Sequence, residues 1–456
     1  MRGGWLALIV IAFALTAWAW PREQGSQGEV LAQGEVLAQG VVLAQGDMLA
    51  GFGISTHALQ PGDPARIRAL GFRYARLDLT WARIETRAGL YDWESYDRRI
   101  ADLAAQGLRP VLILAYSNPL YAPPSQSRQQ AAAWNAPASA QARAAYTAWA
   151  VAAARRYNRY NPVLELWNEP DSEVFWPPKA DADAYIRLAQ DSCQAIRRAT
   201  PEAEIWGPAL SAIGNENGRA SAFLAAVLVS DLPDCLSAIS LHPYLSLHEV
   251  EDLAGYWAQI RALPGAAGRR FVASEWGFSS AFRGMDDQIQ ASYLIRFAAL
   301  AHMAGQGPSL WYTWRNEGAD PTVYVHNYGL VFPDGSPKPA YHALATFRAM
   351  TLGREHQCLL ENDDLTALYA WSQSAPQDVL MIVWRKAGRL FPAISGSLRP
   401  DLPEGATEVR AANLYGQPHS FAGDAPTQGL QLSGQPMPWY IRWQGDLPAA
   451  CVAAPG

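Results

Sequence analysis

The sequence predicts a (β/α)8 TIM barrel followed by a small C-terminal β-sandwich domain, and three observations support this α/β fold class. First, residues 50–350 alternate eight short apolar runs with amphipathic helical patterns. Second, polar and aromatic residues follow several of these runs, at the strand ends where barrel enzymes carry their sites. Third, no glycine-rich phosphate loop follows the first run, although an open doubly wound sheet, the competing fold, would usually have one.

The predicted elements follow one another in the order that a barrel requires. The candidate strands are residues 52–56, 73–79, 109–116, 163–167, 203–207, 238–242, 270–275 and 308–314. Helical patterns lie between them, the clearest at 93–106, 138–157, 181–199 and 286–305. A segment of about 300 residues has room for eight such strand–helix units.

The N-terminal segment predicts export. Arg2 precedes an uncharged stretch at 5–20, and Ala-Trp-Ala at 17–19 has the form of a signal-peptidase site. We therefore predict a signal peptide over 1–19 and a periplasmic or extracellular location. A retained inner-membrane anchor is the alternative, because tryptophans at both ends of the stretch suit a membrane interface, although a spanning helix needs about 20 apolar residues.

A hexapeptide repeat comes next. GEVLAQ occupies residues 28–33 and 34–39, and GVVLAQ follows at 40–45. Three copies of so short a unit are too few to stack into a solenoid. The repeat therefore predicts a low-complexity tether over 20–49, with a short amphipathic surface segment as the alternative.

The four cysteines permit two disulfides, because their number is even and the chain is expected to be exported. Cys358 and Cys451 bracket the C-terminal region, so a bond between them would close that domain, and Cys193 and Cys235 are the remaining pair. Buried free thiols are the alternative. The spacing of the cysteines does not resemble a zinc site.

Residues 351–456 change in character and predict the C-terminal β-sandwich. Three runs alternate as strands do, at 365–373, 378–386 and 438–445. The tryptophans of this region either bind carbohydrate or fill the core of a supporting domain, and we favour the second role: Trp371, Trp384, Trp439 and Trp443.

Composition narrows the range of possible functions. The net charge of −6 comes without any basic block, which argues against nucleic-acid binding. The 18 tryptophans and 19 tyrosines either fill a large core or form surfaces that stack on flat apolar faces, such as those of sugar rings.

Two carboxylates end apolar runs of the predicted barrel. Glu169 follows the fourth strand and Glu275 ends the seventh, so the two can face each other across the barrel mouth. Hydrolysis of a glycosidic bond needs such a pair, because one carboxyl group protonates the leaving oxygen while the other, ionised, attacks the anomeric carbon. The retaining route separates them by about 5–5.5 Å and the inverting route by about 6.5–9.5 Å, a gap that sequence does not give.

These residues resemble the motifs of the clan A glycoside hydrolases. LELWNEPD at 164–171 looks like their acid/base motif after the fourth strand, and SEWG at 274–277 looks like their nucleophile motif. Within the clan the chain resembles glycoside hydrolase family 39, and more narrowly the bacterial exopolysaccharide glycosidases found with biofilm matrix synthesis. Further stretches carry the likeness, at 71–85, 175–185, 241–244 and 328–344.

The resemblance implies roles for individual residues. Glu169 matches the acid/base and Glu275 the nucleophile. Asn168 matches the residue that hydrogen-bonds the sugar 2-hydroxyl. Tyr244 matches the tyrosine that steadies the nucleophile, and Arg76 matches the arginine that keeps it ionised by charge pairing, although a purely structural salt bridge is the alternative for Arg76.

The remaining substrate contacts are less direct. In the context of Tyr244 and the strand end, His242 reads as a site residue rather than a core histidine. The resemblance implies sugar-stacking walls made by Trp276 and Trp314, with Trp81 and Trp176 as outer candidates. Simple strand alternation puts Asn168 and Glu169 on opposite faces, so a bulge or twist is expected there.

Two other acids near the motif have structural interpretations. Glu165 shares strand parity with Glu169, so it should point into the barrel and pair with an arginine such as Arg73 or Arg76. Asp171 lies beyond Pro170 in a loop, where an acid usually caps the loop or is solvated.

The sequence thus predicts an exported retaining glycoside hydrolase, endo-acting on a bacterial exopolysaccharide, with no cofactor and no metal. An exo-acting β-xylosidase or α-L-iduronidase-like enzyme is one alternative, and a non-hydrolytic polysaccharide-binding protein of a matrix synthesis complex is another. The expected partner is a polysaccharide or oligosaccharide and not a nucleic acid. A membrane tether through the N-terminus and a polysaccharide synthesis complex stay open as further partners.

Overall fold

The structure is a computed structural model. It describes residues 41–124, 135–211, 219–244, 250–281, 285–304, 307–361, 365–386, 402–419 and 437–452. The predicted signal peptide at 1–19 and most of the predicted tether, 20–40, lie outside these residues. Within them, none of the helices is both long enough and apolar enough to cross a membrane.

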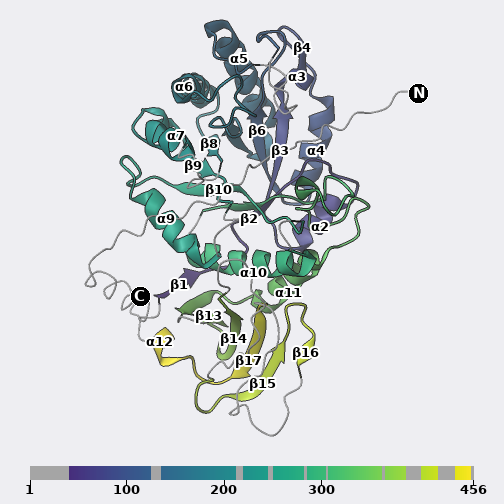
Figure 1. The fold of residues 1–456 in the computed structure, drawn as a ribbon, viewed down its shortest axis with the longest axis vertical. Coiled ribbons are helices and arrows are strands. Elements are labelled where there is room, and N and C mark those ends of the chain that lie inside the picture. The colour runs from purple at the N-terminus through teal and green to yellow at the C-terminus, as the bar shows by residue number, and fades with distance from the viewer. Residues whose placement is uncertain are drawn as a thin grey trace.

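Eight parallel strands form the closed barrel that the sequence predicts (Figure 1). Each lies close to its predicted range, and each pairs with its neighbours in chain order around the barrel. The strands are β2 (Phe52–Ser55), β3 (Tyr74–Thr80), β6 (Arg109–Ala115), β7 (Val163–Leu166), β8 (Glu204–Leu210), β9 (Ala238–Leu241), β10 (Phe271–Trp276) and β11 (Ser309–Trp311).

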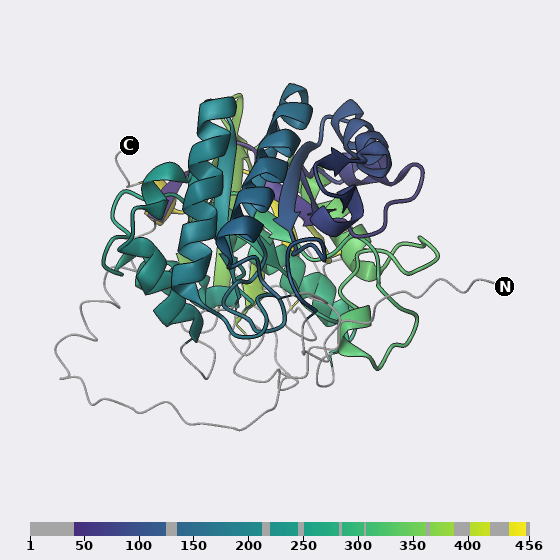
Figure 2. The same ribbon diagram turned by 90° about the horizontal axis from the view of Figure 1, so that it is seen from above.

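Helices between the strands form the outer wall, and the long α5 and α6 lie side by side in it (Figure 2). Side chains of Ser139, Asp181 and Asp286 accept amide N–H bonds at the starts of α5, α6 and α10, which fixes where these helices begin. The helices are α2 (Asp63–Ala69), α3 (Trp81–Ile84), α4 (Glu94–Ala105), α5 (Ala140–Tyr157), α6 (Ala182–Ala199), α7 (Arg219–Leu228), α8 (Leu232–Cys235), α9 (Leu253–Arg261), α10 (Asp287–Met303) and α11 (Pro339–Thr351).

Short elements fill several of the connections. They are the hairpin of β4 (Glu85–Arg87) and β5 (Leu90–Tyr91), the 3-10 turns η2 (Asn158–Tyr160), η3 (Val250–Asp252) and η4 (Tyr324–His326), and α12 (Ala449–Val452).

The interior of the barrel is layered. An apolar layer consists of one buried residue from each of six strands: Val111, Val163, Trp206, Ala238, Val272 and Leu310. On β7 and β10 the polar residues Glu165 and Ser274 come two positions later along the strand. Because the strands are parallel, the polar residues lie nearer the C-terminal ends, and the apolar layer closes the barrel beneath them.

The C-terminal domain is an antiparallel sheet in the order β1-β12-β13-β14-β17-β15-β16. Within the described residues its strands lie in this one sheet rather than in two facing ones. The strands are β1 (Val41–Gln45), β12 (His356–Glu361), β13 (Leu365–Ser372), β14 (Ala375–Arg385), β15 (Thr407–Ala412), β16 (Pro418–His419) and β17 (Trp439–Gln444).

The edge strand β1 corrects the predicted end of the tether. Its residues are the third copy of the hexapeptide repeat, and they pair with β12 in a register that sets Val41 opposite Leu359. Met48 and Leu49, also assigned to the tether, are buried. The tether range of 20–49 was therefore too long, because its last copy has the β-branched residues and apolar flank that a sheet edge can accept.

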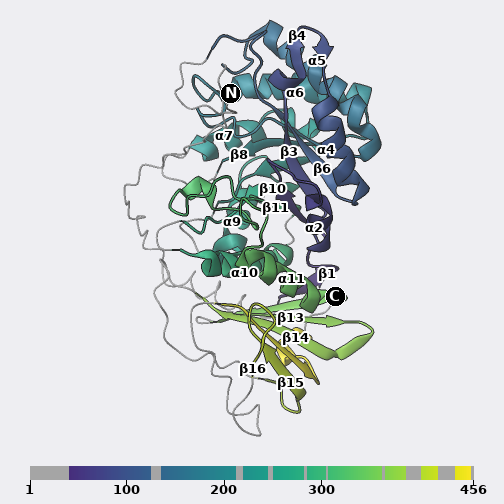
Figure 3. The same cartoon turned by 90° about the vertical axis from the view of Figure 1, so that its right-hand side faces the viewer.

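Helices α10 and α11 lie between the barrel and the sheet (Figure 3). Most of α10 is buried, since it is covered on two sides. Arg296 of α10 donates to Glu251 through Nε and Nη2, and the Trp384 indole of β14 donates to the same carboxylate at 2.6 Å. Trp384 and Trp443 are buried core residues, as the supporting role predicts.

Both predicted disulfides are present. Cys193 of α6 bonds Cys235 of α8, and Cys358 of β12 bonds Cys451 of α12. The second bond ties the chain end to the C-terminal sheet. The described residues include no free cysteine.

Candidate active site

The chain leaves strand geometry at the end of β7, and this brings Asn168 and Glu169 to the barrel mouth together. Trp167 and Glu169 have φ angles of 74° and 47°, in the left-handed region that side chains other than glycine rarely adopt. The Glu169 amide donates to the Ala209 carbonyl at 2.9 Å, which holds the turn against β8. The expected departure from alternation is therefore present, and strained backbone of this kind is typical of functional sites.

Arg76 of β3 is the centre of a buried polar network. Its guanidinium donates to Glu165 at 2.7 Å and to Glu275 at 2.6 Å. Its Nη2 donates to the Asn168 side-chain oxygen at 2.8 Å and lies 3.3 Å from His242 Nε2. Arg76 thus pairs with the interior acid Glu165, as predicted, and also with a mouth carboxylate, so its role is more than structural support.

Glu275 is held as a carboxylate by donors on both of its oxygens. Arg76 donates to one, and the Tyr244 hydroxyl donates to the other at 2.6 Å. Burial would raise the pKa of Glu275, but the charges of His242 and Arg76 and the Tyr244 hydrogen bond outweigh it and hold that pKa below its ordinary value. An ionised, oriented carboxylate is the form that a nucleophile needs.

Glu169 has the opposite environment. Burial raises the pKa of Glu169, and the hydrogen bond from His242 opposes this shift without cancelling it, while the charge of Glu275 adds to it. His242 Nδ1 lies 2.8 Å from Glu169 Oε1. The raised pKa of Glu169 favours its protonated form, the form that a general acid needs. Two carboxyl groups whose pKa values move apart in this way can act as acid and nucleophile at the same pH.

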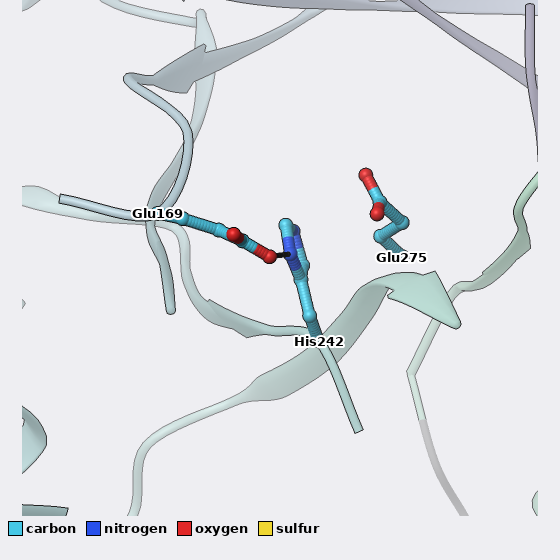
Figure 4. Close-up of side chains that lie close together, drawn as sticks. All are labelled: Glu169, His242 and Glu275. Atoms are coloured by element: carbon cyan, nitrogen blue, oxygen red, sulfur yellow. Dashed lines mark hydrogen bonds and ion pairs between the residues drawn. The ribbon is translucent and has the colours of Figure 1, made fainter. Parts of the chain in front are cut away.

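His242 lies between the two acids (Figure 4). One carboxylate oxygen of Glu169, one of Glu275 and a ring nitrogen of His242 all lie within 4.8 Å of one another. Three such atoms could also hold a metal ion, but Arg76 already supplies positive charge at Glu275. The expectation of a metal-free and cofactor-free site stays a prediction.

The four tryptophans assigned as sugar walls are core residues, and the structure contradicts that assignment. Trp81, Trp176, Trp276 and Trp314 are each at most 2% exposed. Trp276, for example, stacks on Phe297 of α10 with ring centroids 3.3 Å apart. A ring that is covered on both faces cannot stack on a sugar.

Other aromatic residues line the mouth instead. Tyr116 directly follows β6, and Tyr312 directly follows β11; both are half-buried. Their place at strand ends fits this fold, but it does not single them out in the sequence, because Trp81 also directly follows a strand, β3, and is buried. The course of the chain after each strand decides which ring faces the mouth.

One further prediction concerns a loop residue, Asp171. Asp171 accepts hydrogen bonds from the Ser211 amide at 3.1 Å and from its hydroxyl, so it fixes the loop after β7 to the loop after β8. This is the structural role expected for it. The hydrogen bonds from Ser211 also hold the Asp171 carboxylate near Glu169. The negative charge of Asp171 contributes to the raised pKa of Glu169.

The comparisons with known proteins agree with this architecture. The sequence model of the cellulase family, glycosyl hydrolase family 5, matches residues 45–318, which include all eight barrel strands. A family 39 glycoside hydrolase from Bacteroides cellulosilyticus WH2 has a similar structure, with a TM-score of 0.68 and 22% identity over 89% of this chain and 83% of that one. A monomeric beta-xylosidase from Caulobacter crescentus CB15 gives 0.62 and 18%, over 89% and 98%.

At these identities the structural likenesses show a shared fold, barrel and C-terminal sheet together. A curated relative, a beta-xylosidase from Geobacillus stearothermophilus, is 22% identical over 212 residues. That match spans 41% of this chain and 41% of the relative, so less than half of the relative's length is covered.

Proposed function

The chain belongs to the cellulase family, glycosyl hydrolase family 5, and is a glycoside hydrolase; we propose that it cleaves with retention of anomeric configuration, using Glu169 as acid/base and Glu275 as nucleophile. The predicted membership of clan A is thereby confirmed. The narrower likeness to biofilm exopolysaccharide glycosidases remains a prediction.

The separation of the two acids is the observation that carries the retaining proposal. Their nearest oxygens lie within 4.8 Å. A retaining enzyme needs about 5–5.5 Å between its carboxyl groups, whereas an inverting enzyme needs about 6.5–9.5 Å to fit a water molecule between base and sugar. The close approach of Glu169 and Glu275 therefore supports the retaining route.

The first chemical step follows from the two environments. Glu275 attacks the anomeric carbon as the bond to the leaving oxygen breaks, and Glu169 gives its proton to that oxygen. The product is a glycosyl ester on Glu275. Asn168 accepts from Arg76 through its side-chain oxygen, so its amide nitrogen is left to donate to the sugar 2-hydroxyl.

The second step reverses the roles. Glu169, now ionised, takes a proton from water, whose oxygen attacks the anomeric carbon and displaces Glu275. When the leaving group has departed, Arg76 and Tyr244 again hold the free Glu275 carboxylate through its two oxygens. The sugar leaves with its original anomeric configuration, since two inversions have occurred.

We propose a polysaccharide or oligosaccharide as the substrate, and endo action on a bacterial exopolysaccharide stays a prediction. Exo action as a β-xylosidase is the second candidate, favoured by the names of the curated relative and of the Caulobacter structure. The sizes of products released early from a polymer separate the two. Export is supported by the two disulfides, which are typical of oxidising compartments.

Proton NMR of the first products tests the mechanism. We expect the newly released anomer to match the configuration of the bond cleaved, followed by slow mutarotation. An activated 2-deoxy-2-fluoro glycoside should leave a covalent adduct on the peptide that contains Glu275, seen by mass spectrometry. An inverted first product would disprove retention, and an adduct on another residue would disprove the assignment of the nucleophile.

A further inference from the structure

A second polar cluster lies at the barrel mouth beside the catalytic pair, made of His57, Asp78, Tyr312 and Glu317. His57 follows β2, Asp78 lies on β3, and the other two follow β11. These three strands are adjacent in the barrel, and β11 also adjoins β10, which carries Glu275. The cluster therefore occupies one continuous arc of the mouth next to the nucleophile.

Glu317 holds this cluster together. One of its oxygens lies 2.6 Å from His57 Nδ1 and accepts from the Tyr312 hydroxyl, also at 2.6 Å. The other ring nitrogen of His57 lies 4.0 Å from an Asp78 oxygen. His57 and Glu317 are 260 residues apart in sequence, so only the closed barrel brings them together.

The cluster carries net negative charge. Burial lowers the pKa of His57, but its bond to Glu317 and the charges of Glu317, Asp78 and Glu275 outweigh that effect and raise this pKa to about 9. The imidazole is then a cation at neutral pH. Its single positive charge is outnumbered by the two carboxylates of the cluster, Asp78 and Glu317, and the Glu275 carboxylate lies beside them.

The two acids have acceptor capacity that the described protein does not use. No hydrogen bond from a described residue reaches the Asp78 carboxylate, and the second Glu317 oxygen has none either. Their side chains are 33% and 25% exposed. Carboxylate oxygens in a partly enclosed, low-dielectric site bind hydroxyl groups strongly and reject other carboxylates.

The cations near this arc are already committed. Arg76 is shared among Glu165, Glu275 and Asn168, and His57 is bound to Glu317. Arg76 is 1% exposed and offers no face to a substrate carboxylate, and the one unbonded nitrogen of His57, Nε2, lies 4.0 Å from the Asp78 carboxylate, which would repel a second carboxylate there. A uronic acid would therefore bring a fourth negative charge toward Glu275, Glu317 and Asp78, where both cations already face carboxylates of the protein.

We propose that Asp78 and Glu317, with His57 and Tyr312 positioning them, bind the hydroxyl groups of the sugar ring that reacts at Glu275 and select neutral sugars over uronic acids. This inference deepens the proposed function and rests on its placement of the nucleophile. It names neutral glycans as the substrate class and argues against the iduronidase-like alternative.

Equilibrium binding tests the selection without turnover. The host is the full-length Glu169→Gln variant, which leaves the charge of Glu275 in place. The probes are matched oligosaccharide pairs that differ only at C6, gluco- against glucurono-oligosaccharides and manno- against mannurono-oligosaccharides, measured by calorimetry. In at least one pair we expect the neutral member to bind at least about tenfold more tightly than the acidic one.

Adding Glu317→Gln and Asp78→Asn should weaken binding of the neutral oligosaccharide by about tenfold. The difference in affinity between the neutral and acidic members of a pair should also shrink, because both repelling charges are gone. Adding Glu204→Gln at the opposite end of the barrel is the matched control and should leave both affinities unchanged. Thermal unfolding of each variant reports whether it folds, and the smaller exchange Asp78→Asn alone serves if the combined variant does not.

Three results would overturn the proposal. One is that, in every pair that binds, the acidic member binds as tightly as its neutral partner; another is a difference in affinity that survives both substitutions in a folded variant. The third is a failure of every neutral oligosaccharide to bind. The proposed function stands or falls separately, since it depends on the product anomer and on the Glu275 adduct.

Discussion

Arginine–glutamate ion pairs occur at both ends of the barrel, but the two sets differ in their exposure to water. At the mouth, Arg76 is 1% exposed and joins two carboxylates. At the base, Arg109 and Arg270 both bind Glu204, at 2.6 and 2.8 Å, with side chains 25%, 46% and 17% exposed. Water screens the base pairs, whereas the mouth pairs act in a low dielectric.

This difference separates function from support. Removing one partner of a buried pair leaves a charge without solvent, which costs about 3–5 kcal/mol. An exposed pair contributes about 0–1 kcal/mol. The apolar layer that includes Trp206 lies between the two ends and keeps water at the base from reaching the mouth. Matched substitutions at the two ends should therefore have unequal effects on catalysis.

The largest effect is expected from Glu275→Gln. The amide cannot attack the anomeric carbon, so kcat should fall by about 10⁴-fold or more. Steady-state kinetics on the best substrate from a polysaccharide and aryl-glycoside screen measure this loss. Calorimetric binding of the same substrate should persist. Retention of more than a tenth of wild-type activity would mean that another residue is the nucleophile.

Glu169→Gln should have the second largest effect, a loss of about 10²–10⁴-fold on substrates with poor leaving groups. The loss should be smaller on aryl glycosides whose phenol leaves without protonation. Comparing the two substrate types in one kinetic series checks this. Equal losses on both would show that Glu169 does not protonate the leaving oxygen.

Much of this end of the barrel could be predicted from sequence, and the reason is local. Glu169 lies three residues past the end of β7 and Glu275 is the second-last residue of β10, and parallel strands bring such ends to one side. The His57–Glu317 contact has no local signal, because it depends on the closure of the barrel. The tryptophans were misassigned since exposure depends on the turn after each strand, and β1 was missed because its partner β12 lies more than 300 residues away.

Tyr244→Phe should give a smaller loss, of about tenfold, with a change in pH dependence. Activity needs Glu275 ionised and Glu169 protonated, so it rises above the lowered pKa of Glu275 and falls above the raised pKa of Glu169. Without the hydroxyl, the pKa of Glu275 rises and the acidic limb moves to higher pH. The pH profile of kcat/KM measures this shift, and a uniform loss with an unmoved acidic limb would argue for a packing role only.

The smallest effect is expected at the base, from Glu204→Gln. The change removes a carboxylate from between Arg109 and Arg270, and stability at pH 7 should fall by about 1 kcal/mol with kcat unchanged. The two arginines hold the pKa of Glu204 below its ordinary value even though burial acts to raise it. Stabilisation of this sign is complete above the unfolded-state pKa of about 4.3 and disappears as pH falls through the folded-state value.

Urea unfolding of wild type and Glu204→Gln from pH 7 to pH 3 tests the sign and the size together. The stability difference should be largest at pH 7 and should shrink toward pH 3, where the wild-type Glu204 gains its proton. A fall in kcat comparable with that of Tyr244→Phe would contradict the separation of the two ends. It would mean that the apolar layer transmits changes at the base to Arg76, and that support and catalysis in this barrel are coupled.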